Sequence, residues 1–255
     1  MKITVCELND EPAAFLQDWE RLVAHAKNEA SDLILLPEMA FYPWFGWTRQ
    51  VDPAVWDAAV AVHDDWIAER LPELAPATVL GSRPVNKGEK RLNEAFVWTP
   101  EQGYRPAHAK YYLPDEDGYW EASWYQRGDG DFSPIQSGPL RVGFTICTEL
   151  WFTERARAYG KAGIHLLAAP RATGDTTVEK WLVGGRTAAI VSGAFCASSN
   201  RVNGAKTRFG GLGWVIGPDG DVLALTSPEQ PCVTVYIDLA QAERAKQTYP
   251  RYVQE

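Results

Sequence analysis

Apolar residues along the chain occur in two patterns that alternate: short continuous runs, and longer stretches with helical spacing. The run Leu33 to Leu36 is apolar at every position and is ended by Pro37, which is typical of a strand covered on both faces. From Glu11 to Ala30, in contrast, apolar side chains recur every three or four positions, which predicts an amphipathic helix. The same alternation continues along most of the chain.

Strands and helices are therefore expected in turn. The expected helices are Glu11 to Ala30, Pro53 to Leu71, Thr153 to Ala162 and Val178 to Val191. The expected strands are Lys2 to Glu7, Leu33 to Leu36, Thr78 to Ser82, Asn93 to Thr99, Leu140 to Ile146, Ile164 to Ala169, Gly193 to Ser199 and Cys232 to Leu239, with a hairpin from Gly213 to Thr226. This alternation predicts an α/β fold with helices covering the sheets. Because no linker-like or repeated stretch interrupts it, we expect a single domain over residues 1–255.

Composition narrows the possible partners. The 255 residues include 25 Lys and Arg against 33 Asp and Glu, a formal net charge of −8, so no basic surface for nucleic acid is expected. No apolar run reaches the roughly 18 residues needed to span a bilayer, and Glu7 and Asp10 come too early for a secretory signal. The four cysteines are far apart, without a CxxC pair, which argues against a disulfide framework or a zinc site. We therefore expect a cytoplasmic protein with no membrane partner and no metal.

Three reactive side chains follow expected strands or the segments that lead from them. Glu38 and Cys147 each come at the end of a buried strand, and Lys110 follows the segment Tyr104 to Ala109. In α/β folds, ligands bind at the carboxyl ends of the strands. A carboxylate there can take the proton of a thiol, and an ammonium can stabilise an oxyanion. A buried structural cysteine, a helix-capping glutamate and a surface lysine would have the same spacing, so spacing alone leaves both interpretations open.

Longer segments around these residues are more specific. DLILLPEMAFYPWFGW, RPAHAKYYLPDEDGYWEASWYQRGD and LRVGFTICTELWFTERARAYGKAG resemble the three signature segments of the nitrilase, or carbon–nitrogen hydrolase, superfamily. SGAFCASSNRVN and GLGWVIGPDGDVLA look like the closing strands of that family. The resemblance covers nearly the whole chain in the expected order. It implies a four-layer α-β-β-α sandwich and hydrolysis of a carbon–nitrogen bond without a cofactor.

The roles of the family transfer onto single positions. Glu38 matches the general base, Lys110 the lysine of the second segment, and Cys147 the nucleophile. The resemblance implies that the Cys147 thiolate attacks an amide or carbamoyl carbon, while Lys110 and the N–H of Thr148 hold the oxyanion. Glu38 then returns a proton to the departing nitrogen, and water hydrolyses the thioester. None of the four histidines is in a matching position, which argues against a Cys-His protease.

The second glutamate of the family falls on Glu121, in the segment GYWEASWYQRGD. Two nearby acids, Glu116 and Asp117, compete for that role. Glu121 is preferred because the aromatic pair and the Gly128-Asp129 that follow it align without a gap. The resemblance implies that Glu121 orients Lys110 or helps to pass the proton.

Residues beside the motifs are candidates for binding the substrate. Thr148 and Trp151 follow the nucleophile in CTELWF, where many amide-cleaving members have a CWDQWF-like run. Because the two runs differ, the substrate specificity of an individual member cannot be transferred to this chain. Aromatic side chains that flank the motifs are expected either to line a pocket or to pack in the core or a dimer contact. They are Tyr42, Trp44, Trp120 and Trp151.

Arg171 follows the strand Ile164 to Ala169, at the same edge of the sheet. A guanidinium there is expected to bind a substrate carboxylate bidentately. The alternative is a salt bridge to a neighbouring acid such as Glu149.

The expected function is hydrolysis of a small linear amide or N-carbamoyl compound. The alternatives are a nitrilase that uses the same residues through a thioimidate, and a catalytically silent protein that binds a metabolite or acts as a scaffold. Because members of the family usually pair, the resemblance also implies a homodimer or higher homo-oligomer. The helices Val178 to Val191 and Thr153 to Ala162 are the interface candidates.

Overall fold

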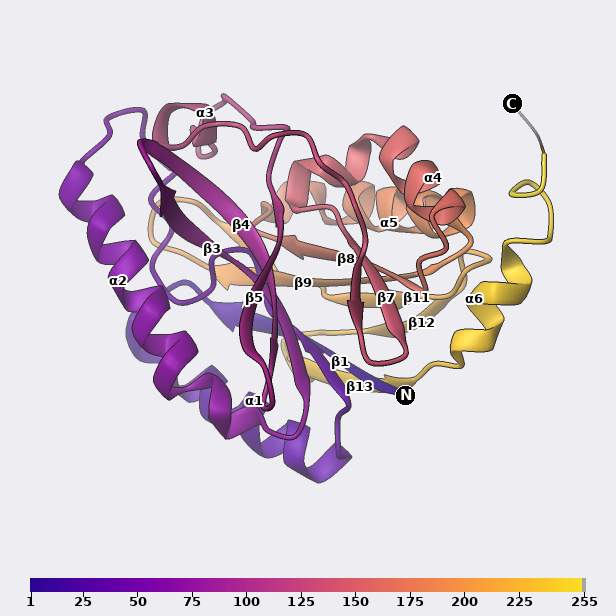
Figure 1. The fold of residues 1–255 in the computed structure, drawn as a ribbon. Coiled ribbons are helices and arrows are strands. Elements are labelled where there is room, and N and C mark those ends of the chain that lie inside the picture. Colours follow the sequence, from indigo (N-terminus) through magenta and orange to yellow (C-terminus); the bar gives the residue numbers. More distant parts are fainter. Residues whose placement is uncertain (254–255) are drawn as a thin grey trace.

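The computed structural model describes residues 1–253 and contains six α-helices and thirteen strands in that part of the chain (Figure 1). The helices are α1 (Pro12–Glu29), α2 (Pro53–Glu69), α3 (Glu121–Trp124), α4 (Thr153–Lys161), α5 (Val178–Ser192) and α6 (Leu239–Ala245), with short 3₁₀ turns η1 (Leu71–Leu74), η2 (Cys147–Trp151) and η3 (Asp175–Thr177). The strands are β1 (Lys2–Asn9), β2 (Leu33–Leu35), β3 (Thr78–Lys87), β4 (Lys90–Thr99), β5 (Gly103–Ala109), β6 (Ile135–Ser137), β7 (Leu140–Phe144), β8 (Leu166–Arg171), β9 (Phe195–Asn203), β10 (Phe209–Gly210), β11 (Trp214–Ile216), β12 (Val222–Leu225) and β13 (Cys232–Tyr236).

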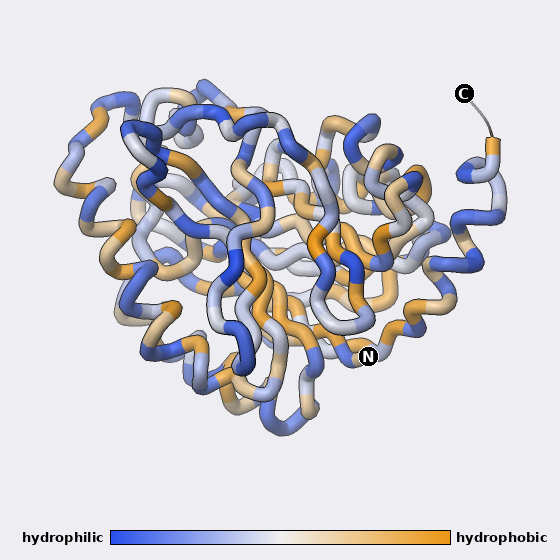
Figure 2. Tube along the Cα trace, viewed as in Figure 1, coloured by the Kyte–Doolittle hydropathy of each residue, from blue (hydrophilic) through white to orange (hydrophobic). Residues whose placement is uncertain are grey.

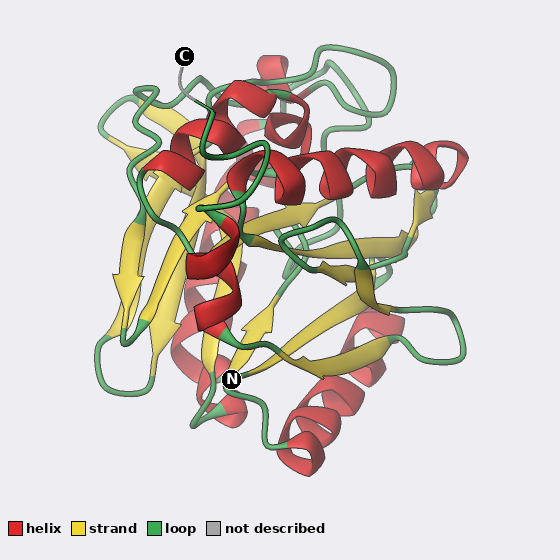
Figure 3. Ribbon diagram, turned by 90° about the vertical axis from the view of Figure 1, so that its right-hand side faces the viewer, coloured by secondary structure: helices red, strands yellow, loops and turns green. Residues whose placement is uncertain are grey.

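The strands follow one hydrogen-bonded order, β5-β4-β3-β2-β1-β9-β8-β7-β6. The inner strands from β3 to β7 are parallel to their neighbours in this order, and the outer strands β4, β5 and β6 join them antiparallel. The strands β5 to β2 form one half of this order, and the strands β9 to β6 form the other. Strand β1 connects the two halves, because its residues 3–5 pair with β2 and its residues 7–9 pair with β9. The two halves pack on each other as the two inner layers of an α-β-β-α sandwich, with helices on both outer sides (Figure 3).

Strand β2 shows how the side chains divide between two cores. Leu33 and Leu35 pack in a cluster with Val142 of β7, in the other half of the sheet, whereas Ile34 packs with Trp19 of α1. Since successive side chains of a strand point to opposite faces, both faces of β2 are covered, as its continuous apolar run predicts. Apolar residues accordingly concentrate in the central strands, while the outer helices alternate between polar and apolar positions (Figure 2).

The expected helices are present within two residues at each end. The expected strand Thr78 to Ser82 is longer, because it continues to Lys87 and forms an antiparallel hairpin with β4. The expected strand Cys232 to Leu239 is too long: it ends at Tyr236, since Asp238 accepts a hydrogen bond from the backbone N–H of Ala240 and caps α6. Sequence analysis did not predict the helices α3 and α6 or the strands β5, β6 and β10.

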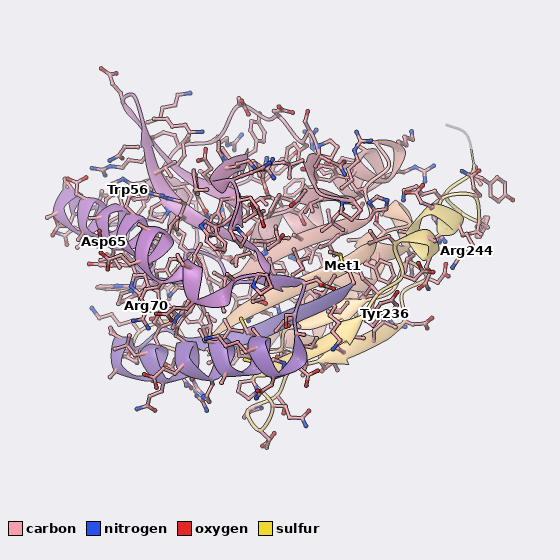
Figure 4. The ribbon with its side chains drawn as sticks, turned by 60° about the horizontal axis from the view of Figure 1, so that its bottom comes forward. Met1, Trp56, Asp65, Arg70, Tyr236 and Arg244 are labelled. Atoms are coloured by element: carbon pink, nitrogen blue, oxygen red, sulfur yellow. The ribbon has the colours of Figure 1, made fainter. Side chains whose placement is uncertain are left out.

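The last strand returns to the first. Tyr236 of β13 lies opposite Lys2 of β1, and Met1 and Tyr236 are close together at this end of the pair (Figure 4). Within residues 1–253, no helix is both long enough and apolar enough to cross a membrane. The same part of the chain contains no group of three or more His, Cys, Asp or Glu side chains arranged to hold a metal ion.

Candidate active site

The carboxyl ends of β2, β5 and β7 bring three expected site residues to one edge of the sandwich. Glu38 follows β2, Lys110 follows β5 and Cys147 follows β7. The Lys110 ammonium lies 2.8 Å from Oε1 of Glu38 and 2.5 Å from Oε2 of Glu121. All three side chains of this ion cluster are fully buried. The structure therefore joins Glu38, Lys110 and Glu121, which are up to 83 residues apart in sequence (121 minus 38).

Two further side chains that sequence analysis missed hold this cluster. The side-chain amide N–H of Asn93 donates a 2.7 Å hydrogen bond to Oε1 of Glu38, and the backbone carbonyl of Asn93 accepts a 2.8 Å bond from the backbone N–H of Lys110. The Tyr125 hydroxyl donates to Oε2 of Glu121. The signal for Asn93 was a polar side chain beside the apolar run Ala95 to Trp98 of β4. The other carboxylate oxygens, Oε2 of Glu38 and Oε1 of Glu121, are buried without a hydrogen-bond partner in the described part of the chain.

The charges of the cluster shift its pKa values. Burial raises the pKa of Glu121 to about 7, although Lys110 opposes the rise, and Glu38 adds to it. Burial alone would lower the pKa of Lys110, but Glu121 and Glu38 raise it above its ordinary value. Burial raises the pKa of the Cys147 thiol, Glu38 raises it further and Lys110 opposes both. At neutral pH Lys110 is therefore an ammonium, Cys147 is a neutral thiol, and Glu121 is near the midpoint of its titration.

Cys147 begins the 3₁₀ turn η2 in a left-handed conformation, with φ of +48°. This region is uncommon for a residue other than glycine, and such strain clusters at functional sites. The side chain is 3% exposed, and Sγ lies 4.0 Å from the carbonyl oxygen of Ala172. The chain thus turns sharply after β7, and Cys147 lines a cavity.

The cavity has a volume of about 420 Å³ and is lined by motif residues and by the start of α5. Its lining is Pro114, Glu116, Tyr119, Glu121, Cys147, Thr148, Trp151, Ala172, Thr173, Gly174, Thr176, Thr177, Lys180 and Trp181. Thr148 and Trp151 lie beside the nucleophile, where sequence analysis expected them. Of the three competing acids, the structure brings Glu121 to Lys110, whereas Glu116 and Asp117 are exposed.

Arg171 is not part of this lining. Its guanidinium is fully buried and stacks 3.9 Å from the centroid of the Trp214 ring. All three guanidinium nitrogens already donate to protein oxygens, namely the hydroxyls of Ser198 and Thr173 and the carbonyl of Leu212. The expected contact of Arg171 with a substrate carboxylate is not supported by this placement. The alternative salt bridge to Glu149 is not formed either, because Glu149 pairs with His108.

The aromatic residues that flank the motifs separate into two groups. Only Trp151 of the four lines the cavity, where it packs 5.0 Å from the ring of Trp181. Tyr42 lies at a different hollow, beside Phe15 and Phe41, so its expected contact with the substrate is also not supported. Trp44 is buried in an aromatic core cluster, and Trp120 stacks under Arg49, 3.8 Å from ring centroid to guanidinium carbon.

Arg201 fixes the segment that follows β2 and was missed by sequence analysis. Its Nε donates a 3.0 Å hydrogen bond to the carbonyl of Glu38, and its Nη2 donates to the carbonyls of Met39 and Tyr42. Asp10 pairs with the same guanidinium. Sequence analysis could have found Arg201 because a charged side chain is unusual in a buried strand such as the closing segment SGAFCASSNRVN.

The chain is similar in sequence to two omega-amidases and in fold to two solved structures. An omega-amidase from Arabidopsis thaliana is 26% identical over 97% of this chain and 70% of its own length. An omega-amidase from Homo sapiens is 27% identical over 91% of this chain and 86% of its own length. The crystal structure of a carbon-nitrogen hydrolase from Helicobacter pylori has the same fold, with a TM-score of 0.85 at 22% identity over 98% of this chain and 94% of that one.

An amidase from Nesterenkonia sp. also shares the fold, with a TM-score of 0.75 at 21% identity over 95% of this chain and 92% of that one. The family model of the carbon-nitrogen hydrolases matches residues 2–247. The chain therefore belongs to the carbon-nitrogen hydrolase family.

Proposed function

We propose that this protein hydrolyses the carbon–nitrogen bond of a small linear amide or N-carbamoyl compound through a thioester on Cys147. The observation that carries the proposal is the buried cluster of Glu38, Lys110 and Glu121 next to a strained cysteine that lines a cavity. Such a cluster is costly to bury. It supplies a base and a cation, and Cys147 supplies the nucleophile. The relatives named omega-amidases support an amide as the substrate.

The first half of the reaction forms the thioester. The free Oε2 of Glu38 takes the proton of the Cys147 thiol, and the sulfur attacks the carbonyl carbon as a carbon–sulfur bond forms. The oxyanion is stabilised by the Lys110 ammonium and the backbone N–H of Thr148. When the intermediate collapses, the carbon–nitrogen bond breaks, and Glu38 gives its proton to the nitrogen, which leaves as ammonia or an amine.

The second half returns the enzyme to its starting state. Glu38 takes a proton from water, and the resulting hydroxide attacks the thioester carbon. The carbon–sulfur bond breaks, the product leaves as an acid, and the sulfur regains a proton from Glu38. The net change consumes one amide and one water and produces one acid and one amine or ammonia. Glu121 holds Lys110 in place through both halves.

The wall of the cavity supports a preference for a substrate with a negatively charged far end. Lys180 of α5 lines the cavity, is exposed and makes no ion pair with any residue in the described range 1–253. Glu116 lies on the loop before α3 and is exposed at the same cavity. A substrate with a carboxylate directed at Lys180 and away from Glu116 gains attraction without repulsion. Thr176 offers a hydroxyl along the same wall, whereas the Thr173 hydroxyl accepts from Arg171 and the Thr177 hydroxyl donates to the carbonyl of Gly174.

The test is ammonia release from a panel of amides, N-carbamoyl amino acids, ureido amines and nitriles, with mass spectrometry of the Cys147 peptide during turnover. We expect amides or carbamoyl compounds to be cleaved and an acyl adduct to accumulate on Cys147. Cys147→Ala is expected to lose both, while Cys232→Ala, which changes a half-buried cysteine of β13, keeps both. Turnover of nitriles alone would identify a nitrilase, and inactivity on the whole panel would favour a binding or scaffolding protein.

A further inference from the structure

A carboxylate outside the ion cluster connects the two segments that carry Lys110 and Cys147. Glu149 is fully buried two positions after Cys147. Its Oε1 accepts a 2.7 Å hydrogen bond from the backbone N–H of Tyr111, which follows Lys110. Its Oε2 accepts a 2.9 Å hydrogen bond from the backbone N–H of Ile146, which precedes Cys147. One side chain therefore bridges the end of β5, in one half of the sheet, and the end of β7, in the other.

A buried histidine holds this carboxylate. Nε2 of His108 lies 2.8 Å from Oε2 of Glu149, and Nδ1 lies 2.8 Å from the carbonyl oxygen of Asp131. A neutral imidazole has a single N–H, and the Asp131 carbonyl can only accept. The pair of His108 and Glu149 must therefore hold one further proton between Nε2 and Oε2. The His108 ring is 4% exposed and packs 4.5 Å from the ring of Phe132.

The charges around His108 favour this proton. Burial alone would lower the pKa of His108, but the Glu149 carboxylate and the Asp131 carbonyl raise it above its ordinary value, and Asp129 adds to the rise. From α4, the Tyr159 hydroxyl also interacts with the charge of Glu149 while it donates to the carbonyl of Phe144. The groups around the pair are thus carboxylates, a carbonyl and a neutral hydroxyl, with the Arg155 guanidinium of α4 on the ring of Phe132. The imidazolium of His108 is the cation in direct contact with Glu149.

We propose that Glu149 and His108 are positioning residues that fix the Cys147 thiol relative to the Lys110 ammonium. Neither side chain belongs to the cavity lining formed by the described residues, so both act through the backbone of the neighbouring segments. A displacement of about 1 Å in a reacting group can lower a rate about 100-fold, and here one carboxylate fixes two segments from different halves of the sheet. The inference rests on the proposed function only in taking Cys147 as the nucleophile.

The experiment measures the rate at which iodoacetamide alkylates Cys147, followed on its peptide by mass spectrometry, and it requires no substrate. In Glu149→Gln, a single oxygen replaces two acceptors, so one of the two backbone segments is released. We expect alkylation to slow about tenfold or more. His108→Phe keeps a flat ring against Phe132 but offers no donor to Glu149, and we expect a similar loss.

The conservative variants separate positioning from packing. His108→Gln keeps a donor for Glu149 and is expected to remain within about threefold of the wild-type rate, whereas a role in packing alone would affect the two His108 variants equally. Glu149→Asp keeps a carboxylate and is expected to react faster than Glu149→Gln. The matched control is His165→Gln, which removes a 2.9 Å histidine–glutamate pair with Glu243 far from this site.

Some results would overturn the inference. A folded Glu149→Gln protein that alkylates at the wild-type rate would do so, and so would equal losses in His108→Phe and His108→Gln. If His108→Phe does not fold, the alkylation rates of the two Glu149 variants provide the test: Glu149→Asp must react faster than Glu149→Gln for the inference to hold. Failure of the proposed function gives a different result, namely a wild-type protein that is inactive on every compound of the panel while these alkylation rates still differ.

Discussion

At the scale of single residues, the ion cluster has one negative charge too many when both carboxylates are ionised. Glu38 and Glu121 share one ammonium, that of Lys110, in a fully buried space. Buried charge without compensation is unfavourable, and burial raises the pKa of Glu121 to about 7, against the opposing effect of Lys110. Glu121 is therefore the group that takes up a proton as the pH falls towards neutrality. The ion pair between Lys110 and Glu121 is then lost, and the contact of Lys110 with Glu38 remains.

This titration predicts a pH dependence that belongs to one residue. Below about pH 7, Glu121 is protonated and its hold on Lys110 weakens, so kcat/KM of the wild type is expected to rise through that pH. In Glu121→Gln the rise near pH 7 should be lost, and kcat should fall about 10- to 100-fold. Glu116→Gln, on the wall of the same cavity, is the control and should keep the rise. A rise near pH 7 that persists in Glu121→Gln would assign the titration to another group.

Lys180 carries a prediction about specificity. Lys180→Met should raise KM about three- to fivefold for amides with a carboxylate at the far end, because an exposed ion pair contributes at most about 1 kcal/mol. Neutral amides of the same length should keep their KM. Lys27→Met, which removes the same charge from the exposed end of α1, controls for overall charge. Equal changes for acidic and neutral amides would exclude a direct contact.

Arg171 carries a prediction about stability instead of specificity. Burial lowers the pKa of its guanidinium to about 9, and three protein oxygens accept its hydrogen bonds. Arg171→Met leaves these acceptors buried without donors and should lower the free energy of unfolding by about 3 kcal/mol in urea titrations. Arg208→Met, at an 84% exposed side chain, should change it little. A selective rise in KM for acidic amides at unchanged stability would restore the substrate role.

The difference between Arg171 and the motif residues shows what a sequence can predict. Glu38, Lys110 and Cys147 lie in segments whose sequence resembles that of a family. Glu38 and Cys147 also follow strands that the local pattern predicts, whereas Lys110 follows β5, which the pattern did not predict as a strand. Arg171 was expected just after a strand and is the last residue of β8. Its guanidinium points into the core, where Ser198 of the neighbouring strand β9 accepts a hydrogen bond from it. Local pattern places the Cα atom at the correct edge; long-range packing decides where the side chain points.

At the scale of elements, the long apolar runs and long amphipathic helices were predicted, and short connecting elements were not. α3 has four residues, too few for a helical period to be visible in the sequence. Its position depends on contacts across the loop, such as Gly128, where a Cβ atom would lie 2.3 Å from the carbonyl oxygen of Ala109. Glu121 could therefore be selected from its sequence motif, whereas the position of α3 relative to β5 could not be predicted from the sequence.

The link between β5 and η2 predicts a pH dependence of stability. Because the folded protein raises the pKa of His108, its imidazolium stabilises the fold fully below the unfolded value of about 6.5, and this stabilisation is lost as the pH rises through the folded value. The stability difference between wild type and His108→Gln should thus be largest near pH 6 and shrink at alkaline pH. Urea titrations at several pH values measure it. A difference that grows with pH would contradict the charged state.

At the scale of the whole molecule, the two halves of the sheet supply different parts of the site. Glu38 and Lys110 follow β2 and β5 in one half, and Cys147 follows β7 in the other. The cavity lies where the two halves meet, and so do the hydrogen bonds by which Glu149 joins Tyr111 to Ile146. Any change in the packing between the halves therefore changes the distance between nucleophile and base. This is a physical reason for a fold of this kind to keep a dry, closely packed interface between its sheets.

The outer face of α5 leads to a prediction about assembly. Val183 is 62% exposed there, and Trp151, 45% exposed, packs against the same helix at Gly184. Large apolar side chains gathered on an exposed face are typical of a protein interface. We propose a homodimer, or a higher homo-oligomer built on it, that packs α5 and α4 against a second copy.

Light scattering behind a sizing column should give at least the mass of two chains, and Val183→Glu should reduce it to the mass of one chain. Leu16→Glu, at an exposed position of α1, should leave the assembly intact. Because Trp151 also lines the cavity, Val183→Glu should change KM as well as mass, and an unchanged KM in a monomeric variant would separate the interface from the site.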